Sequence, residues 1–246
     1  MDLRSKTILI TGGGTGIGRA VAIAAAREGA NVVVNYSRSK AEAETTLAEI
    51  ERCGCEGFIV QADVSDNNQV VRMRDEVLER FGRIDCLVNN AGTTDFVPLQ
   101  DLEGLREEHW DRAFNVNVKG MFFTSRACAD ALRKARGSIV NITSIAGFNG
   151  AGSSMAYAAS KAAGISVTKS FAKVLAPDVR VNSVAPGIVL TRWVDGRDDH
   201  VKTYSDNTPL GRPAYPEDVA QVAIALVRNA DFVTGQTIVV DGGWSL

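Results

Sequence analysis

Short runs of β-branched and apolar residues alternate with longer helical stretches along almost the whole chain of 246 residues. Strands separated by helices predict right-handed βαβ units and therefore a parallel sheet. We predict strands at Thr7–Ile10, Asn31–Asn35, Gly57–Gln61, Ile84–Val88, Ser138–Ile142, Arg180–Val184 and Thr237–Val240. We predict helices at Ile17–Glu28, Lys40–Arg52, Asn67–Phe81, Glu107–Arg133, Ser154–Leu175 and Pro216–Arg228. The alternation indicates an α/β fold.

Four segments that suit ligand binding directly follow predicted strands. They are Gly12–Gly18, Asn89–Gly92, Ser144 and Pro186-Gly187. Open parallel sheets bind ligands beyond the carboxyl ends of their strands, at the point where the strand order reverses. We therefore expect all four segments to meet at one edge of the sheet and to form one site.

Length and charge limit the remaining possibilities. A chain of this length can form one large α/β domain or two small ones, and no linker, charge block or repeat divides it, so we expect one domain over residues 1–246. The net charge of −2 does not favour a nucleic-acid partner or an anionic membrane surface. No apolar stretch approaches the length of a membrane span, and the first residues leave no room for a signal peptide. We expect a cytoplasmic protein.

The cysteines and histidines do not have the spacing of a metal site. Cys53 and Cys55 are too close for a zinc knuckle, and no second pair follows them. Cys86 falls in a predicted strand and Cys128 in a predicted helix, where a free thiol behaves as a small apolar side chain. The histidines, His109 and His200, are far apart in the sequence. We expect reduced thiols and no bound metal.

The glycine-rich segment after the first strand predicts an anion site. Ile8–Ile10 is followed by Thr-Gly-Gly-Gly-Thr-Gly-Ile-Gly, ending at Gly18, and then by an Ala-rich helix. Glycines let the backbone approach a ligand, and the amino end of a helix favours a pyrophosphate. The spacing is not G-x-G-x-x-G, because Ile17 stands where the third glycine would fall. A flexible glycine loop without a ligand is the alternative interpretation.

Tyr157 and Lys161 are four residues apart in Tyr-Ala-Ala-Ser-Lys, and Ser144 precedes Tyr157 by thirteen residues. Residues i and i+4 share one face of a helix, so the phenol and the ammonium can point to one place. An ammonium beside a phenol favours the phenolate, and we expect it to lower the pKa of Tyr157. Such a tyrosine can act as a general acid or base. The alternative is a surface helix with ordinary Tyr and Lys side chains.

These motifs together resemble the short-chain dehydrogenase/reductase family, in its compact one-domain branch. The likeness covers nearly the whole chain and rests on motifs in the family's order: Thr11–Gly18, Asn89–Gly92, Asn117 in Asn-Val-Lys-Gly, Ser144 with Tyr157 and Lys161, and Pro186-Gly187 with Thr191. The resemblance implies a doubly wound Rossmann fold with a seven-stranded parallel sheet in the order 3-2-1-4-5-6-7 and helices on both faces.

The resemblance also implies roles for single residues. The catalytic residues would be Asn117, Ser144, Tyr157 and Lys161. The cofactor would contact Gly12, Gly14, Thr15, Gly16, Ile17, Gly18, Ser37, Arg38, Asp63, Val64, Asn90, Ala91, Gly92, Tyr157, Lys161, Pro186, Gly187, Ile188 and Thr191. The mechanism implied is hydride transfer to a carbonyl carbon, with Ser144 bonded to the carbonyl oxygen, Tyr157 as proton donor and Lys161 on the cofactor ribose. Asn117 would position a water, although Asn115 competes for this role.

The end of the second strand bears on which dinucleotide binds. An NAD enzyme usually offers Asp or Glu there, whereas Arg accommodates the 2′-phosphate of NADP. This chain has Ser37, Arg38, Ser39 and Lys40, and no acid before Glu42. We therefore favour NADP(H) over NAD(H). Against this stands Thr15, at a place where NADP(H)-binding members of the family often carry a basic residue. Asp63 resembles the residue that contacts the adenine, or is an ordinary turn aspartate.

Two segments, residues 93–109 and 188–213, are expected to overhang the cofactor and to select a small carbonyl or alcohol substrate. Their apolar members suggest a partly apolar pocket without a fixed cationic clamp, although Arg192 and Arg197 can move in. The apolar candidates are Phe96, Val97, Leu99, Leu102, Trp193, Val194 and Tyr204, with Gly147, Phe148, Asn149 and Met155 on the remaining wall.

Within the family, the chain most resembles the 3-oxoacyl-carrier-protein reductases and the sugar or secondary-alcohol dehydrogenases. A carrier protein is acidic, and Arg133, Lys134 and Arg136 could meet it at the mouth of the site. Ala176-Pro177-Asp178 departs from the basic linker of family reductases, which weakens this assignment. The resemblance also implies a homo-oligomer, a tetramer or a dimer, with Trp244 either as an interface anchor or packed in its own subunit.

Two other interpretations remain open. A protein of this fold can sense or scaffold a dinucleotide without catalysis. Such a protein would be expected to lose one of Ser144, Tyr157 and Lys161, and this chain has all three. A sugar-nucleotide epimerase or dehydratase of the longer branch would carry a differently spaced glycine turn and an extra substrate domain, of which this chain has no trace.

Overall fold

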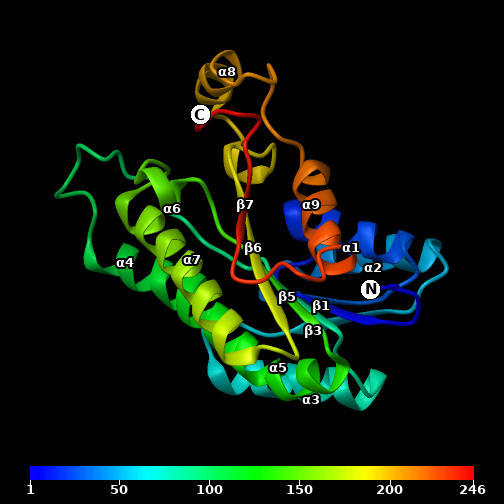
Figure 1. Cartoon of the computed structure of the whole chain (residues 1–246). Coiled ribbons are helices and arrows are strands. Elements are labelled where there is room, and N and C mark those ends of the chain that lie inside the picture. The colour runs from blue at the N-terminus through cyan, green and yellow to red at the C-terminus, as the bar shows by residue number, and fades with distance from the viewer.

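A computed structural model describes residues 1–246, apart from the side chain of His200. Its centre is a seven-stranded parallel sheet in the order β3-β2-β1-β4-β5-β6-β7 (Figure 1). The strands are β1 (Thr7–Ile10), β2 (Asn31–Tyr36), β3 (Gly57–Gln61), β4 (Cys86–Asn89), β5 (Ser138–Ile142), β6 (Arg180–Pro186) and β7 (Thr237–Val240). The predicted strand order is confirmed. It reverses between β1 and β4, where such sheets bind ligands.

Helices cover both faces of the sheet, as predicted (Figure 1). One face carries α1 (Gly16–Arg27), α2 (Lys40–Arg52) and α9 (Pro216–Arg228). The other carries α3 (Asn67–Phe81), α5 (Met121–Ala135) and α7 (Met155–Leu175). Within the described chain, no helix combines the length and the apolar character that crossing a bilayer requires.

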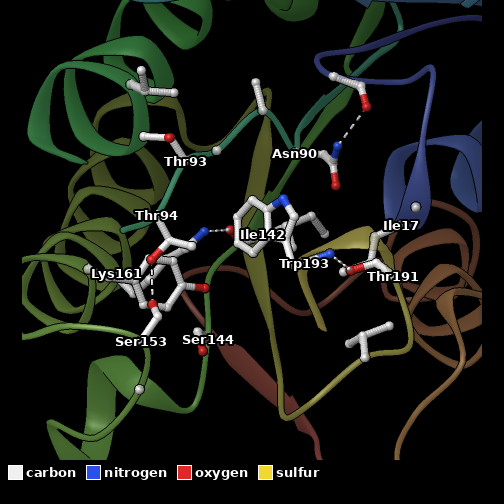
Figure 2. A pocket seen from close by; sticks show the side chains of 18 of the residues that line it. Ile17, Asn90, Thr93, Thr94, Ile142, Ser144, Ser153, Lys161, Thr191 and Trp193 are labelled. Atoms are coloured by element: carbon white, nitrogen blue, oxygen red, sulfur yellow. Dashed lines mark hydrogen bonds between the residues drawn. The ribbon is translucent and has the colours of Figure 1, made fainter. Parts of the chain in front are cut away.

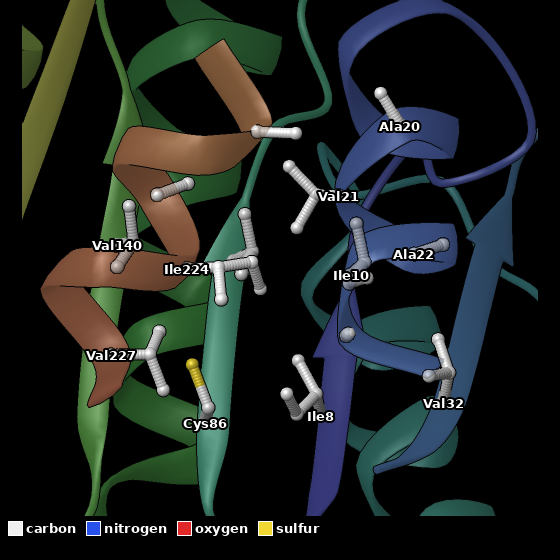
Figure 3. Close-up of a cluster of buried hydrophobic side chains, with 14 of the residues drawn as sticks. Ile8, Ile10, Ala20, Val21, Ala22, Val32, Cys86, Val140, Ile224 and Val227 are labelled. Carbon is white, nitrogen blue, oxygen red and sulfur yellow. The ribbon is translucent and has the colours of Figure 1, made fainter. Parts of the chain in front are cut away.

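The alternation of side chains along each strand divides the core into two layers. Ile8 and Ile10 of β1 are fully buried against α1 and α9, whereas Leu9 between them is buried on the opposite face. Figure 3 shows the first layer, in which Val21 of α1 and Ile224 of α9 meet the strand side chains. Both faces of the strands are apolar, which is why the strands read as continuous hydrophobic runs.

The prediction of one continuous helix over Glu107–Arg133 is wrong. The structure has α4 (Glu107–Phe114), a π-helical segment (Asn115–Gly120) and then α5. A Cβ at Gly120 would lie 2.7 Å from Val64 Cγ2, so this segment packs too tightly on the loop after β3 for a larger side chain. Hydrophobic periodicity does not reveal an i→i+5 turn, and such turns are frequent at functional sites.

Three short elements were not predicted. They are α6 (Ala146–Asn149), a 3₁₀ turn (Arg192–Val194) and α8 (Asp198–Asp206). The last of these lies inside residues 188–213, which we expected to be a loop. Acidic residues at its first turn and a Lys202–Asp206 pair four residues apart stabilise it locally, although the segment has little apolar periodicity.

Candidate active site

A cavity of about 1300 Å³ lies at the carboxyl edge of the sheet, across the point where the strand order reverses. The turns that follow β1, β2, β3, β4, β5 and β6 all contribute to its wall. Figure 2 shows side chains from these distant segments facing one another across it. The four segments singled out in the sequence therefore meet in one place, as expected.

Nearly all the predicted site residues line this cavity. Those that do are Gly12, Gly14, Thr15, Gly16, Ile17, Ser37, Arg38, Asp63, Val64, Asn90, Ala91, Gly92, Ser144, Tyr157, Lys161, Pro186, Gly187, Ile188 and Thr191. Gly18 and Asn117 stand behind the wall. Gly18 faces the glycine turn itself, and Asn117 is buried behind Gly92. Both therefore act on the shape of the wall and do not form its surface.

The glycine turn is built for close approach of backbone to backbone. Gly12 has φ +63°, a left-handed conformation that favours glycine. A Cβ at Gly18 would lie 2.3 Å from the Gly12 carbonyl oxygen and 2.4 Å from Asn90 Nδ2, distances that no real Cβ tolerates. The Asn90 amide donates to the carbonyls of Thr11 and Gly12, at 3.0 Å each. Asn90, the first residue after β4, therefore holds the glycine turn in place although it lies far from the turn in the sequence.

The amino end of α1 points into this turn. The helix begins at Gly16, and within the described chain the preceding Thr15 side chain makes no capping hydrogen bond. The first backbone amides of the helix therefore keep their donors for a ligand. These amides and the helix dipole together suit a pyrophosphate.

The charge around the cavity also suits an anion. Among the described lining residues the one carboxylate is Asp63, against five cationic side chains: Arg38, Arg112, Lys161, Arg192 and Arg197. Arg112 is paired with Asp95, and the others face the cavity without such a partner in the described chain. One oxygen of Asp63 accepts from the backbone and hydroxyl of Ser65, so Asp63 is a turn aspartate that also lines the cavity.

Three reactive side chains converge at the other end of the cavity. Ser144, just after β5, accepts a hydrogen bond from the Ala146 amide at 3.1 Å. Tyr157 and Lys161 project from α7, whose first turn is capped by Ser154. Lys161 Nζ donates to the Ile142 carbonyl at 2.9 Å and lies 5.5 Å from the centroid of the Tyr157 ring. The predicted trio is therefore assembled from β5 and α7.

The predicted fall in the pKa of Tyr157 is wrong for this structure. Tyr157 is partly buried at the wall of the cavity, and this desolvation raises its pKa to about 12. A hydrogen bond with Ser144 lowers it, but by less. Burial also lowers the pKa of Lys161 to about 8. The ammonium is directed at the Ile142 carbonyl, so it does not reach the phenol oxygen as the sequence argument assumed.

Asn117 occupies the middle of the π-helical segment, where its amide is fully used. Asn117 Nδ2 donates to the Thr93 carbonyl and to Ser160 Oγ, at 2.9 Å each, and its Oδ1 accepts from the Thr93 amide at 2.8 Å. These bonds tie the segment after β4 to α7. Asn115, the competing residue, lines the cavity instead.

The substrate side of the cavity is partly as expected. Phe96, Val97, Leu99, Asn149, Trp193, Val194 and Tyr204 line it. Four other predicted wall residues, Leu102, Gly147, Phe148 and Met155, do not. Leu102, Phe148 and Met155 point outward to solvent, whereas Gly147 packs on the backbone of α7. The stack of Arg197 on the Phe96 ring, 3.5 Å from its centroid, links the two predicted substrate segments.

Sequence reasoning missed two connections across the cavity. Arg192 Nη1 donates to Ser39 Oγ at 3.4 Å, so this side chain reaches across the cavity to the segment after β2. The hydroxyls of Thr94 and Ser153 share a hydrogen bond at the opposite wall. Each connection joins segments more than fifty residues apart, and no local pattern marks such a pair.

The structure also places the basic residues before β5 and the C-terminal Trp244. Arg133, Lys134 and Arg136 come just before β5, at the amino edge of the sheet, so they do not flank the mouth of the cavity in one copy of the chain. Trp244 stacks on Tyr204 of the same chain, with ring centroids 5.2 Å apart, and is only partly buried, so its role as an interface anchor stays a prediction.

The predicted locations of the buried thiols are confirmed. Cys86 and Cys128 are fully buried, and desolvation raises the pKa of each thiol to about 12. The described residues include no cluster of His, Cys, Asp or Glu that could hold a metal ion, and the side chain of His200 lies outside them.

A doubly wound parallel sheet with a glycine turn at its switch point defines a dinucleotide-binding protein of the Rossmann type. Comparison with known proteins narrows this class. A family profile described as enoyl-(acyl carrier protein) reductase matches residues 12–245. The 3-oxoacyl-(acyl-carrier-protein) reductase FabG of Staphylococcus aureus is 40% identical over 245 residues, which is 97% of this chain and 98% of that protein. FabG of Thermotoga maritima is 40% identical over 249 residues, with 99% of both chains covered.

Solved structures agree with this result. The structure described as short-chain dehydrogenase/reductase SDR:glucose/ribitol dehydrogenase from Brucella melitensis has a TM-score of 0.92 and 32% identity, with 100% of this chain and 98% of that chain covered. The chain belongs to the short-chain dehydrogenase/reductase family. It is accordingly an NAD(P)-dependent oxidoreductase that acts on CH–OH or keto groups.

Proposed function

We propose that the protein reduces a ketone to a secondary alcohol with NADP(H), with Tyr157 as the general acid. The observation that carries this proposal is the convergence of Ser144, Tyr157 and Lys161 at one end of a cavity whose other end is the amino terminus of α1. One end suits proton transfer to a carbonyl oxygen, and the other suits a pyrophosphate. A non-catalytic dinucleotide sensor does not require the first of these features.

The cavity fits a nicotinamide dinucleotide, which when bound supplies the hydride for the carbonyl carbon. The glycine turn would hold the pyrophosphate. The close packing at Gly18 and the hydrogen bonds from Asn90 fix the conformation of this turn. Asp63 and Val64 would lie along the adenine, and Pro186, Gly187 and Thr191 would border the nicotinamide side. This assignment is supported by the position of all these groups in one cavity with a surplus of cationic side chains.

The residues at the reactive end of the cavity then have different roles. The phenol of Tyr157 is protonated at neutral pH, so it can donate its proton to the carbonyl oxygen. Ser144 would donate a second hydrogen bond to the same oxygen. Lys161 would hold the cofactor ribose, and its lowered pKa lets it exchange a proton near neutral pH. Asn117 would act by positioning the segment after β4, because its amide is already bonded to Thr93 and Ser160.

The preference for NADP(H) rests on the segment after β2. Ser37 and Arg38 line the cavity there and no carboxylate does, so a 2′-phosphate meets a cation and hydroxyls. Thr15 supplies no second cation from the glycine turn. The proposed preference therefore depends on Arg38 and on other cations that reach the same end of the cavity.

A 3-oxoacyl thioester is the substrate class that the relatives favour, because the FabG proteins of Staphylococcus aureus and Thermotoga maritima are named 3-oxoacyl-(acyl-carrier-protein) reductases. Phe96, Val97 and Leu99 give the cavity an apolar wall that an acyl chain can use. A carrier protein as partner has less support, because the basic residues before β5 lie away from the cavity mouth.

The test is loss of reduced-nicotinamide absorbance with acetoacetyl thioesters, β-ketoesters, diketones and ketoses, and with an enoyl thioester as a separate arm. We expect turnover by the wild type and a fall of about a thousandfold in Tyr157→Phe. Tyr215→Phe, at an exposed tyrosine outside the cavity, is the matched control and should keep full activity. Cofactor binding without turnover on any substrate would favour the sensing interpretation, and full activity in Tyr157→Phe would exclude the proposed general acid.

A further inference from the structure

Arg192 belongs to the 3₁₀ turn after β6, but its guanidinium lies on the far side of the cavity. Arg192 Nη1 donates to Ser39 Oγ at 3.4 Å, and Ser39 lies between the end of β2 and the start of α2. The contact joins residues 153 positions apart in the chain. A side chain from the predicted substrate segment therefore reaches the segment that decides between the two dinucleotides.

The turn that carries Arg192 rests on the glycine turn. Thr191 Oγ1 accepts from the Trp193 amide at 3.4 Å and caps the 3₁₀ turn. A Cβ at Gly16 would lie 3.1 Å from Thr191 Cγ2, so Thr191 packs directly over the first residue of α1. This packing fixes the point from which the Arg192 side chain extends, above the place where a pyrophosphate would lie.

Arg192 and Arg38 approach the same end of the cavity from opposite sides. Ser37, Arg38, Ser39 and Arg192 all line the cavity there. Within the described chain neither guanidinium forms an ion pair, whereas Arg19 on the neighbouring helix is bound to Glu49 at 2.6 Å. The Arg192 guanidinium therefore donates to a neutral hydroxyl. A phosphate oxygen could take the place of this hydroxyl and form a stronger, charge-assisted hydrogen bond.

We propose that Arg192 is a specificity-determining residue for NADP(H), forming with Arg38 a two-guanidinium site for the 2′-phosphate. This inference rests on the proposed function, because it assumes a dinucleotide in the cavity. It assigns to the segment after β6 a role at the adenosine end, in addition to the substrate side where we placed it from the sequence. It also explains how the site compensates for Thr15, which supplies no cation from the glycine turn.

The test is the affinity of four probes, NADPH, NADH, 2′,5′-ADP and 5′-ADP, measured by calorimetry without substrate. In Arg192→Ala we expect NADPH and 2′,5′-ADP to bind about tenfold more weakly, because one charged hydrogen-bond donor is lost. NADH and 5′-ADP should change less than twofold. Arg192→Lys should recover part of the loss, and the loss should shrink as salt is raised. Lys202→Ala removes one positive charge from the same segment outside the cavity and should change none of the four affinities.

The outcomes separate this inference from the proposed function. If the wild type binds NADPH no better than NADH, the proposed cofactor preference is wrong whatever the variant does. If the wild type prefers NADPH but Arg192→Ala weakens both dinucleotides equally, or neither, the inference about Arg192 alone is overturned. Thermal unfolding of each variant without ligand shows whether a lost affinity reflects a lost fold, and Arg192→Lys keeps the test valid if the alanine variant is unstable.

Discussion

Trp193 packs edge to face against Tyr157, with ring centroids 6.2 Å apart and an angle of 76° between the ring planes. The same indole approaches the segment after β4, since a Cβ at Gly92 would lie 3.7 Å from Trp193 Cη2. Figure 2 shows the ring projecting into the cavity. One side chain of the segment after β6 therefore limits both the motion and the solvent access of the proposed proton donor.

We expect Trp193→Ala to lower kcat/KM about fivefold, because an aromatic pair of this geometry contributes about 1 kcal/mol. The variant should also lower the pKa of Tyr157 toward its usual value, since the raised value comes from desolvation. The alkaline limb of the pH–rate profile should then move to lower pH. Trp193→Phe keeps a ring at this position and should leave that limb nearly in place. An unchanged profile in Trp193→Ala would show that the indole does not shield the phenol.

Gly18→Ala tests whether the glycine turn is a built site or a flexible loop. The added methyl would lie 2.3 Å from the Gly12 carbonyl oxygen, so the turn or α1 must shift. We expect at least a hundredfold loss of dinucleotide affinity, measured by calorimetry, since backbone donors must stay in register with the pyrophosphate. Gly13→Ala is the milder comparison, because a Cβ there lies 3.2 Å from its nearest neighbour, needs a shift of only a few tenths of an ångström, and the residue has an ordinary φ. Equal affinities in the two variants would favour the flexible loop.

The sequence was sufficient where the signal is local. Hydrophobic runs such as Ile8–Ile10 reveal strands, and the order of the sheet follows from the family that the motifs indicate. The same motifs placed Ser144, Tyr157 and Lys161 in one cavity correctly. These features depend either on the spacing of residues within a short segment or on the edge of the sheet at which a strand ends.

The features that the sequence did not reveal depend on contacts between distant segments. The direction of Lys161 is set by the Ile142 carbonyl, so its ammonium does not meet the phenol as the four-residue spacing suggested. The path of Arg192 is set by packing of Thr191 on the glycine turn. The π-helical turn around Asn117 leaves no trace in hydrophobic periodicity, because it changes the backbone ladder and not the pattern of apolar residues.

Asn117→Ala tests which asparagine matters. The substitution leaves the Thr93 amide and carbonyl and the Ser160 hydroxyl without their partner in a buried place. We expect a loss of about 2 kcal/mol in the free energy of unfolding and a fall of about 5 °C in Tm. Activity should fall as well, because the segment after β4 is no longer held against α7.

Asn115→Ala is the matched control for this prediction. Asn115 lines the cavity and is not held by the bonds that fix Asn117. We expect a change of less than 1 °C in Tm, measured by calorimetry under the same conditions. If Asn115→Ala lost more activity than Asn117→Ala while both kept their Tm, the asparagine role would belong to Asn115.

The buried ammonium of Lys161 gives the protein a defined dependence of stability on pH. Burial lowers the pKa of Lys161 from 10.5 to about 8, so between these values the unfolded chain binds more protons than the folded one. The free energy of unfolding must therefore rise with pH across this window, and below it the buried charge costs roughly 3 kcal/mol. Tyr157 is protonated in both the folded and the unfolded chain below pH 10, so it does not affect this slope. Above pH 10 the folded chain keeps the Tyr157 proton longer than the unfolded chain, and the free energy of unfolding falls as pH rises.

Lys161→Met removes this charge but keeps much of the side-chain volume. We expect the difference in Tm between variant and wild type to be most favourable to the variant at pH 7 and to shrink by about 5 °C by pH 9.5. Lys169→Met, at an exposed lysine of the same helix, should show no such trend. The lost bond to the Ile142 carbonyl shifts the variant equally at every pH, so it does not affect the slope. If the difference in Tm stayed constant from pH 7 to pH 9.5, the folded state would keep the Lys161 proton throughout this range. Burial would then not lower the pKa of Lys161 enough for proton exchange near neutral pH.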